Sequence, residues 1–154
     1  MDRQRLENVK SRISLAVSLF AVTAFLAACA TETSTDNDGG ERSTTVTGEV
    51  KEWTVSVDNA TVPAGDLTFT VTNAGTMDHE FLVVKTDLPD GAIPLEGDRF
   101  SESLESISVI DEIGEFAAGT TETLTVTLEP GNYQLVCNIP AHYQLGMHTP
   151  FVVE

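Results

Sequence analysis

The chain is poor in basic side chains. Only 8 of its 154 residues are Lys or Arg, against 24 Asp and Glu. The net charge of −16 becomes about −18 from Cys29 onward, because residues 1–12 carry a net positive charge of two. Nucleic-acid binding needs a basic surface, so this composition excludes nucleic acid as a partner. The same charge repels an anionic membrane surface and would steer in a basic protein partner. A solvated acidic surface that keeps the protein soluble in a salty exterior is the alternative.

No apolar run is long enough for an ordinary membrane-spanning helix, which needs ~20 residues. The longest, residues 13–28, follows the basic residues 1–12 and ends in small side chains, a pattern typical of a secretory signal. Its end, Leu26-Ala27-Ala28-Cys29, resembles a bacterial lipobox, in which the Cys becomes the first mature residue and carries lipid. We therefore expect residues 1–28 to be a lipoprotein signal peptide. An ordinary signal peptide or an uncleaved anchor are the alternatives.

Cysteine is scarce, since Cys29 and Cys137 are the only two. If Cys29 carries lipid, Cys137 has no disulfide partner within the chain. A lone Cys in an exported protein forms an intermolecular disulfide, is a reactive thiol or binds a metal. A disulfide between the two is the alternative, and it would constrain little of the fold. Residues 31–45 contain no apolar residue, so residues 29–45 are expected to be the lipidated Cys and a flexible polar tether.

Residues 46–154 have the pattern of a β-domain. Their alternating or compact apolar runs are short and are separated by Gly- and Pro-containing turns. These runs lie at residues 50–57, 67–72, 80–84, 123–128, 133–136 and 149–153. The pattern predicts an all-β fold, an antiparallel Greek-key β-sandwich.

Two local features refine this expectation. Leu104, Ile107 and Ile110 follow one another at near-helical spacing, which predicts one short helix on the side of the sandwich within residues 101–113. In residues 50–57, alternation predicts that Trp53 shares one face of a strand with the valines that follow it.

Three side chains that bind soft or borderline metals lie close together near the C-terminus. Cys137 offers a thiolate, His142 an imidazole and Met147 a thioether, which is the donor set that suits copper cycling between Cu(I) and Cu(II). A trigonal site with a long axial Met needs a second histidine, and the chain has only His79, His142 and His148. His79 begins one expected strand and Cys137 ends another, so both are expected at the same end of the sandwich.

The order His79, then Cys137-x₄-His142-x₄-Met147, resembles the cupredoxins, the small blue copper proteins. The loop CNIPAHYQLGM is most similar to the rusticyanin and sulfocyanin type, and the resemblance covers about residues 46–154. It implies one copper ion bound by His79, Cys137 and His142, with Met147 as a weak axial ligand. His148 is not a ligand in this family, and we expect it to face solvent; replacement of Met147 by His148 is the alternative.

Two residues depart from the family pattern. Ala141 stands where similar loops commonly have Gly. Glu80 follows His79, where many members have an Asn or Ser whose side chain holds the two ligand loops together.

The expected four ligands leave no position for a substrate, which favours an electron carrier over an enzyme. Three histidines cannot build a multicopper cluster, and a dinuclear electron-transfer centre needs a second Cys in the loop. We expect a monomer that carries one electron at a time between redox proteins, anchored by lipid at the extracytoplasmic face of a bacterial membrane. Extracytoplasmic copper delivery is the main alternative, although Met- and His-rich tracts are missing; a metal-free interaction domain is another.

Electrons are expected to enter through the exposed edge of His142. The apolar side chains near that residue should form the docking patch for a redox partner; they are Ile139, Pro140, Ala141 and Met77.

Overall fold

Nine β-strands make up most of the described part of the chain, residues 43–154, in this computed structural model. The predicted signal peptide, Cys29 and the tether as far as residue 42 lie outside the described residues. No helix among the described residues is long and apolar enough to cross a membrane.

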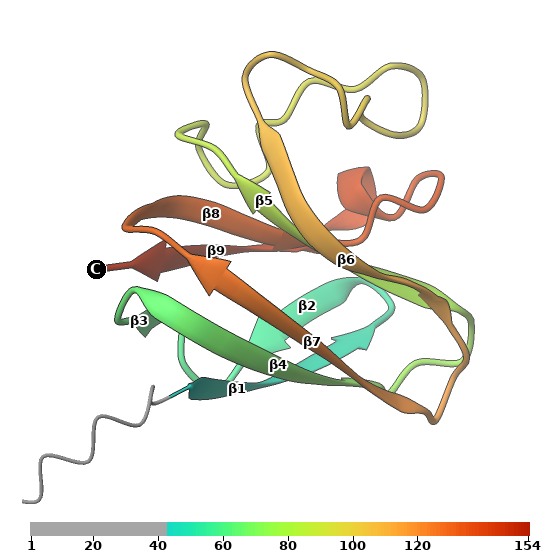
Figure 1. Cartoon of the computed structure of the whole chain (residues 1–154). Helices are drawn as coiled ribbons and strands as arrows, with labels where there is room; N and C mark the ends of the chain where they lie inside the picture. The colour runs from blue at the N-terminus through green and yellow to red at the C-terminus, as the bar shows by residue number, and fades with distance from the viewer. Residues whose placement is uncertain (1–42) are drawn as a thin grey trace, which may run out of the picture. The chain divides into compact units, whose positions relative to one another are not determined.

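The strands form two sheets that pack as two layers (Figure 1). One sheet has the order β2-β1-β4-β7 and the other the order β3-β9-β8-β5-β6. The strands are β1 Thr44–Lys51, β2 Thr54–Val57, β3 Thr61–Val62, β4 Gly65–Asn73, β5 His79–Lys85, β6 Ser108–Phe116, β7 Thr121–Leu128, β8 Gly131–Val136 and β9 His148–Val153. The predicted all-β sandwich is confirmed, with one refinement: β1 pairs with β4, and β3 with β9, in parallel, so both sheets are mixed.

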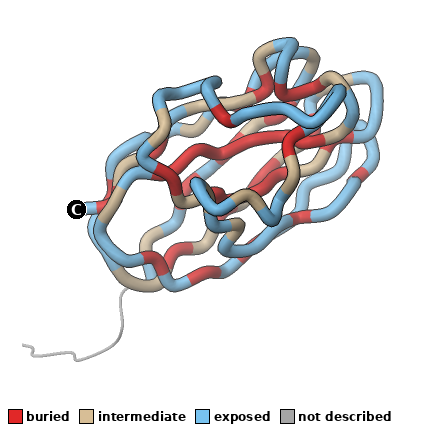
Figure 2. The backbone as a smooth tube through the Cα atoms, turned by 90° about the horizontal axis from the view of Figure 1, so that it is seen from above, coloured by how far each residue is buried: buried red, intermediate tan, exposed pale blue. Residues whose placement is uncertain are grey.

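Alternating burial places the main core between the sheets. In β4, Leu67, Phe69 and Val71 are fully buried, whereas the threonines between them face outward. Buried positions recur inside the strands and the connecting loops are mostly exposed (Figure 2). This core reaches the end of the sandwich where β5 begins and β8 ends, and it includes Cys137 and Met147.

Strand β5 is buried on both faces, which explains its compact apolar run. Phe81 and Val83 belong to the main core. Leu82 and Val84 belong to a second core that is covered by the long segment between β5 and β6, including Ile93 and Phe100. The strand that carries His79 is therefore held from both sides.

The helix predicted within residues 101–113 is wrong. The chain makes turns up to Ile107 and then forms β6, which pairs antiparallel with β5. Leu104 and Ile107 still pack on the second core, so their apolar spacing reflects burial by turns and not helical periodicity. Pairing with the open edge of β5 satisfies a row of backbone groups that a helix there would leave unpaired. Within the described residues, the only helical element is the short 3-10 helix η1 (Tyr143–Leu145).

The strand predicted at residues 50–57 is in fact two strands joined by a tight turn. Lys51 pairs with Thr54, which leaves Glu52 and Trp53 as the turn. Trp53 is 39% exposed, so it does not share the buried face of Val55 as expected. Strand β1 itself starts at Thr44, slightly before the expected domain boundary at residue 46.

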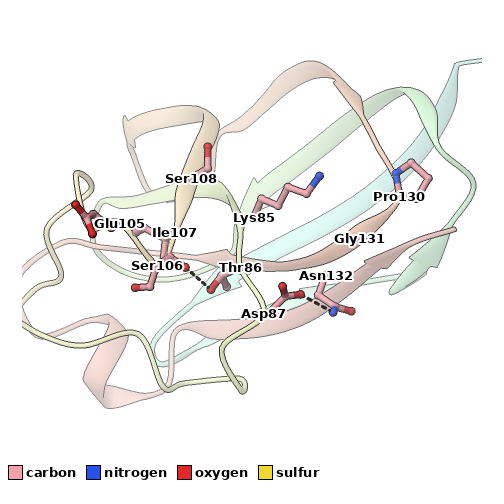
Figure 3. A pocket seen from close by; sticks show the side chains of 10 residues that line it. All are labelled: Lys85, Thr86, Asp87, Glu105, Ser106, Ile107, Ser108, Pro130, Gly131 and Asn132. Atoms are coloured by element: carbon pink, nitrogen blue, oxygen red, sulfur yellow. Dashed lines mark hydrogen bonds between the residues drawn. The ribbon is translucent and has the colours of Figure 1, made fainter.

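A surface cavity of about 420 Å³ lies at the far end of β5 from His79 (Figure 3). It is lined by the ends of β5, β6 and β8, and by polar side chains such as Thr86, which donates to the backbone of Ser106, and Asn132, which donates to Asp87. The seven residues of β5 span roughly 20 Å, so this cavity is remote from the predicted ligands.

Candidate metal centre

The predicted ligands meet at one end of the sandwich. His79 is the first residue of β5, Cys137 follows β8, His142 precedes η1 and Met147 precedes β9. His142 is 6% exposed and the other three are fully buried. Donor atoms of His79, Cys137 and His142 all lie within 4.8 Å of one another, a group that can hold a metal ion.

Nitrogen and sulfur atoms converge in this group. His142 Nδ1 lies 3.3 Å from His79 Nδ1 and 3.3 Å from Cys137 Sγ. Two neutral imidazoles whose Nδ1 atoms face each other cannot both use their lone pairs without a shared proton or cation. The donor set is soft to borderline, so these residues fit copper better than a hard cation such as Mg²⁺.

Met147 is tied to the same group through the backbone. The Cys137 N–H donates to the Met147 carbonyl at 3.0 Å, and the Met147 N–H donates to the His142 carbonyl at 3.1 Å. The loop between β8 and β9 is thus closed on itself, and the Met147 side chain packs in the same core cluster as Cys137.

His148 lies apart from this group. Its Nδ1 contacts Asp90 Oδ1 at 2.9 Å, and its ring packs against Tyr143. The side chain is 24% exposed. His148 therefore faces solvent only in part, and its placement gives no support to His148 as a substitute for Met147.

Comparison with known proteins identifies the fold. Auracyanin from the photosynthetic bacterium Roseiflexus castenholzii matches with a TM-score of 0.52 and 26% identity, over 73% of this chain and 98% of that one. Auracyanin B matches with a TM-score of 0.55 and 20% identity, over 72% and 88% of the two chains. The chain has the cupredoxin fold.

A third solved structure shows the same fold. The azurin Az-iso2 from the obligate methylotroph Methylomonas sp. strain J is 16% identical, with a TM-score of 0.52, over 73% of this chain and 99% of that one. No protein-family profile and no curated protein sequence matches the chain. The resemblance predicted from the ligand motif is confirmed, and the His–Cys–His group agrees with one copper ion per chain.

Glu80, which departs from the family pattern, still links the segment of His79 to the segment of Cys137. Its carboxylate accepts a hydrogen bond from the Asn138 N–H, and its own N–H donates to Cys137 Sγ at 3.5 Å. The first-ligand strand is thereby joined to the cysteine loop of the cupredoxin site. Burial, opposed by the Asn138 hydrogen bond, raises the pKa of Glu80 to about 7.

Asn73 shapes the segment that leads to His79. Its side-chain amide donates to the carbonyls of Met77 and Phe116, both at 2.9 Å, and its oxygen accepts from the Gly75 N–H at 3.0 Å. The residue is fully buried, so its side chain provides the hydrogen bonds that water cannot make to these backbone groups.

Ala141 has a backbone φ of 72°, in the left-handed region. A side chain disfavours this region, which explains why glycine is common at this point of similar loops. We expect Ala141→Gly to raise the free energy of unfolding by about 0.5–1 kcal/mol, because relief of strain exceeds the added chain entropy. Ala117→Gly, in a turn with ordinary backbone angles, should instead be destabilising. Urea unfolding of the two metal-free variants measures both free energies of unfolding. Equal destabilisation in the two variants would contradict backbone strain at Ala141.

The metal-free centre holds one proton that copper must displace. Burial raises the pKa of the Cys137 thiol to about 11 and lowers the pKa of both His79 and His142. Near neutral pH, the thiol is therefore protonated and the imidazoles are neutral. Copper uptake should release about one proton, and the apparent affinity should rise about tenfold per pH unit below the thiol pKa. Calorimetry in two buffers of different ionisation enthalpy measures the release; no buffer dependence would contradict it.

Sequence reasoning missed two residues of the centre, Glu52 and Trp53. The Trp53 ring meets the His142 ring edge-on, with centroids 5.1 Å apart. His142 is consequently almost covered, and the expected exposed edge of His142 amounts to only 6% of the residue. A signal was present: Val50 and Val55 are an odd number of residues apart, so one continuous strand cannot bury both on one face.

Glu52 lies beside the first ligand. Its Oε1 accepts from the Thr76 N–H at 2.7 Å, the Thr76 hydroxyl at 3.2 Å and the Met77 N–H at 3.1 Å. These hydrogen bonds, led by the Thr76 N–H, lower the pKa of Glu52 to about 2, so the carboxylate is ionised. The same oxygen lies 3.7 Å from His79 Nε2.

Proposed function

We propose that this protein is a mononuclear type 1 copper protein that carries single electrons. The observation that supports this most is the convergence of His79, Cys137 and His142 in a buried group beside Met147. Copper bound there supplies one-electron chemistry between Cu(I) and Cu(II). The cupredoxin fold of the auracyanins and azurin agrees with the proposal.

The protein's own residues suit a carrier. The ligand loop is closed by its backbone hydrogen bonds, and β5 is packed on both faces, so the donors have little freedom to move when the charge of the centre changes. Apolar side chains around Cys137 exclude water from the sulfur. The buried group offers no open position for a substrate, so we propose no enzymatic activity.

Electrons enter and leave through the ring of Trp53 in this proposal. The indole is 39% exposed and contacts His142, whereas His142 itself is nearly covered. Two other exposed apolar side chains lie near it: Met77, whose N–H is bonded to Glu52, and Leu145, which precedes the Gly146 that approaches the Trp53 carbonyl. We call Trp53, Met77 and Leu145 the apolar rim, and it takes the place of the patch expected around the edge of His142.

The proposed partners are redox proteins with a basic surface around an apolar contact, because the chain is strongly acidic. The proposed location is the extracytoplasmic face of a bacterial membrane, with lipid on Cys29 and residues 29–45 as a tether. The sequence of the leader and the polar composition of the tether support this placement. The carrier is proposed to act as a monomer.

The rate of electron self-exchange in the Trp53→Ala variant tests whether electrons pass through the Trp53 ring. We expect slower electron self-exchange, measured by NMR line broadening of mixed Cu(I) and Cu(II) protein, with an unchanged visible spectrum. Leu145→Ala is the matched control, because Leu145 belongs to the same rim and is 50% exposed, but no ring contact joins it to His142. Exchange in Trp53→Ala that equals or exceeds that of the control would contradict the route. Loss of copper to a Cu(I) chelator during redox cycling would favour delivery over electron transfer.

A further inference from the structure

The two nitrogens of the His79 ring face different surroundings. Nδ1 points to the ligand group, where it lies 3.3 Å from His142 Nδ1. Nε2 is the one buried side-chain nitrogen or oxygen without a hydrogen-bond partner among the described residues. A buried ring nitrogen without a partner destabilises the fold, so native structures nearly always supply one.

Glu52 can act as the hydrogen-bond acceptor for His79 Nε2. Its Oε1 lies 3.7 Å from His79 Nε2, and the Glu52 side chain is 21% exposed. The carboxylate cannot drift away easily, because three hydrogen bonds from Thr76 and Met77 hold the same oxygen. An approach of about half an ångström brings oxygen and nitrogen within hydrogen-bond distance.

Gly75 keeps this contact open. A Cβ added at Gly75 would lie 2.9 Å from both carboxylate oxygens of Glu52 and 2.9 Å from His79 Nε2. Any side chain there would enter the space between the two groups and push them apart. The absence of a side chain at Gly75 therefore agrees with a hydrogen bond between Glu52 and His79. The turn itself is already held by the hydrogen bond from the Gly75 N–H to Asn73.

We propose that Glu52 is the positioning residue for the first copper ligand: its carboxylate accepts a hydrogen bond from the Nε2–H of His79 and so leaves the Nδ1 lone pair free for the metal. This inference rests on the proposed copper site. A carboxylate that orients a ligating histidine fixes its tautomer and raises its basicity. Its negative charge also favours Cu(II) over Cu(I), so Glu52 lowers the reduction potential of the centre.

The tautomer of His79 in the metal-free full-length protein is the first test. Nitrogen-15 NMR of the histidine rings near neutral pH should show His79 with its proton on Nε2. Glu52→Gln should keep this tautomer, because the amide oxygen can still accept from Nε2 and from the 76–77 segment. Glu52→Leu removes the acceptor and should give a substantial fraction of the Nδ1–H tautomer. An unchanged His79 tautomer in Glu52→Leu would overturn the proposal.

The reduction potential of the copper-loaded protein is the second test. Glu52→Gln should raise the potential by more than Glu49→Gln does. Glu49 is the matched control: it lies on β1, three residues before Glu52, and is paired with Lys51 at 2.9 Å. It does not contact a ligand, yet its replacement removes the same charge. Equal shifts in the two variants would overturn the proposal.

Gly75→Ala gives an independent check that keeps both partners. The added methyl group should shift the His79 tautomer in the same direction as Glu52→Leu, and an unchanged tautomer would count against the contact. If copper fails to bind the wild-type protein, the proposed function fails, whereas the tautomer measurements on metal-free protein still decide the role of Glu52.

Discussion

Replacement of Cys137 by Ala is expected to lower the affinity for copper by more than about 100-fold, the upper end of what loss of an outer partner of a metal ligand costs. Cys137 is the only sulfur donor within the group of three that can hold a metal ion. Its loss also leaves two facing imidazoles with no anionic ligand to offset the charge of the ion. Competition with a chelator of known affinity measures the change in wild-type and variant protein.

His148→Ala is the control for that experiment. His148 is the third histidine, but it pairs with Asp90 and lies outside the ligand group. Its removal should leave the copper affinity within about twofold, as for a surface substitution away from the site. A comparable loss in both variants would mean that His148 takes part in binding and that the ligand assignment is wrong.

Replacement of Asn73 by Ala is expected to reduce the free energy of unfolding by about 3 kcal/mol. Two carbonyls and one N–H, those of Met77, Phe116 and Gly75, lose their partner. The site is buried, so each group left unsatisfied costs about 1 kcal/mol or more. Urea denaturation of the metal-free protein measures the loss.

Asn132→Ala is the matched control for this prediction. Asn132 is exposed, and its side chain makes one hydrogen bond, to Asp87 at 2.9 Å. Its removal should change the unfolding free energy by less than about 0.5 kcal/mol. Similar losses at the two positions would contradict the view that Asn73 secures the segment before His79.

The convergence of the expected ligands could be predicted because three of them lie in one short loop. Cys137, His142 and Met147 are brought together by local chain closure, which sequence spacing reports directly. His79 required one further step, that the start of one strand and the end of another meet at the same end of a sandwich. Neither step depends on details of packing.

The contacts of Glu52 and the strand β6 could not be predicted in the same way. Glu52 reaches the ligand region through hydrogen bonds to Thr76, 24 residues away, and nothing local at position 52 reports them. The spacing of Leu104 and Ile107 favours a helix locally, but the segment is decided by the edge of β5 and by the second core that it covers. Tertiary contacts decide both features, and in β6 they outweigh local periodicity.

Addition of Cu(II) to the full-length protein, with visible and EPR spectra, tests the central claim most directly. The buried His–Cys–His group beside Met147 predicts an intense thiolate-to-copper band and a narrow copper hyperfine splitting, both lost in Cys137→Ala. Retention of the band in Cys137→Ala, or a colourless protein with the wide splitting of ordinary Cu(II) complexes, would contradict a type 1 copper centre.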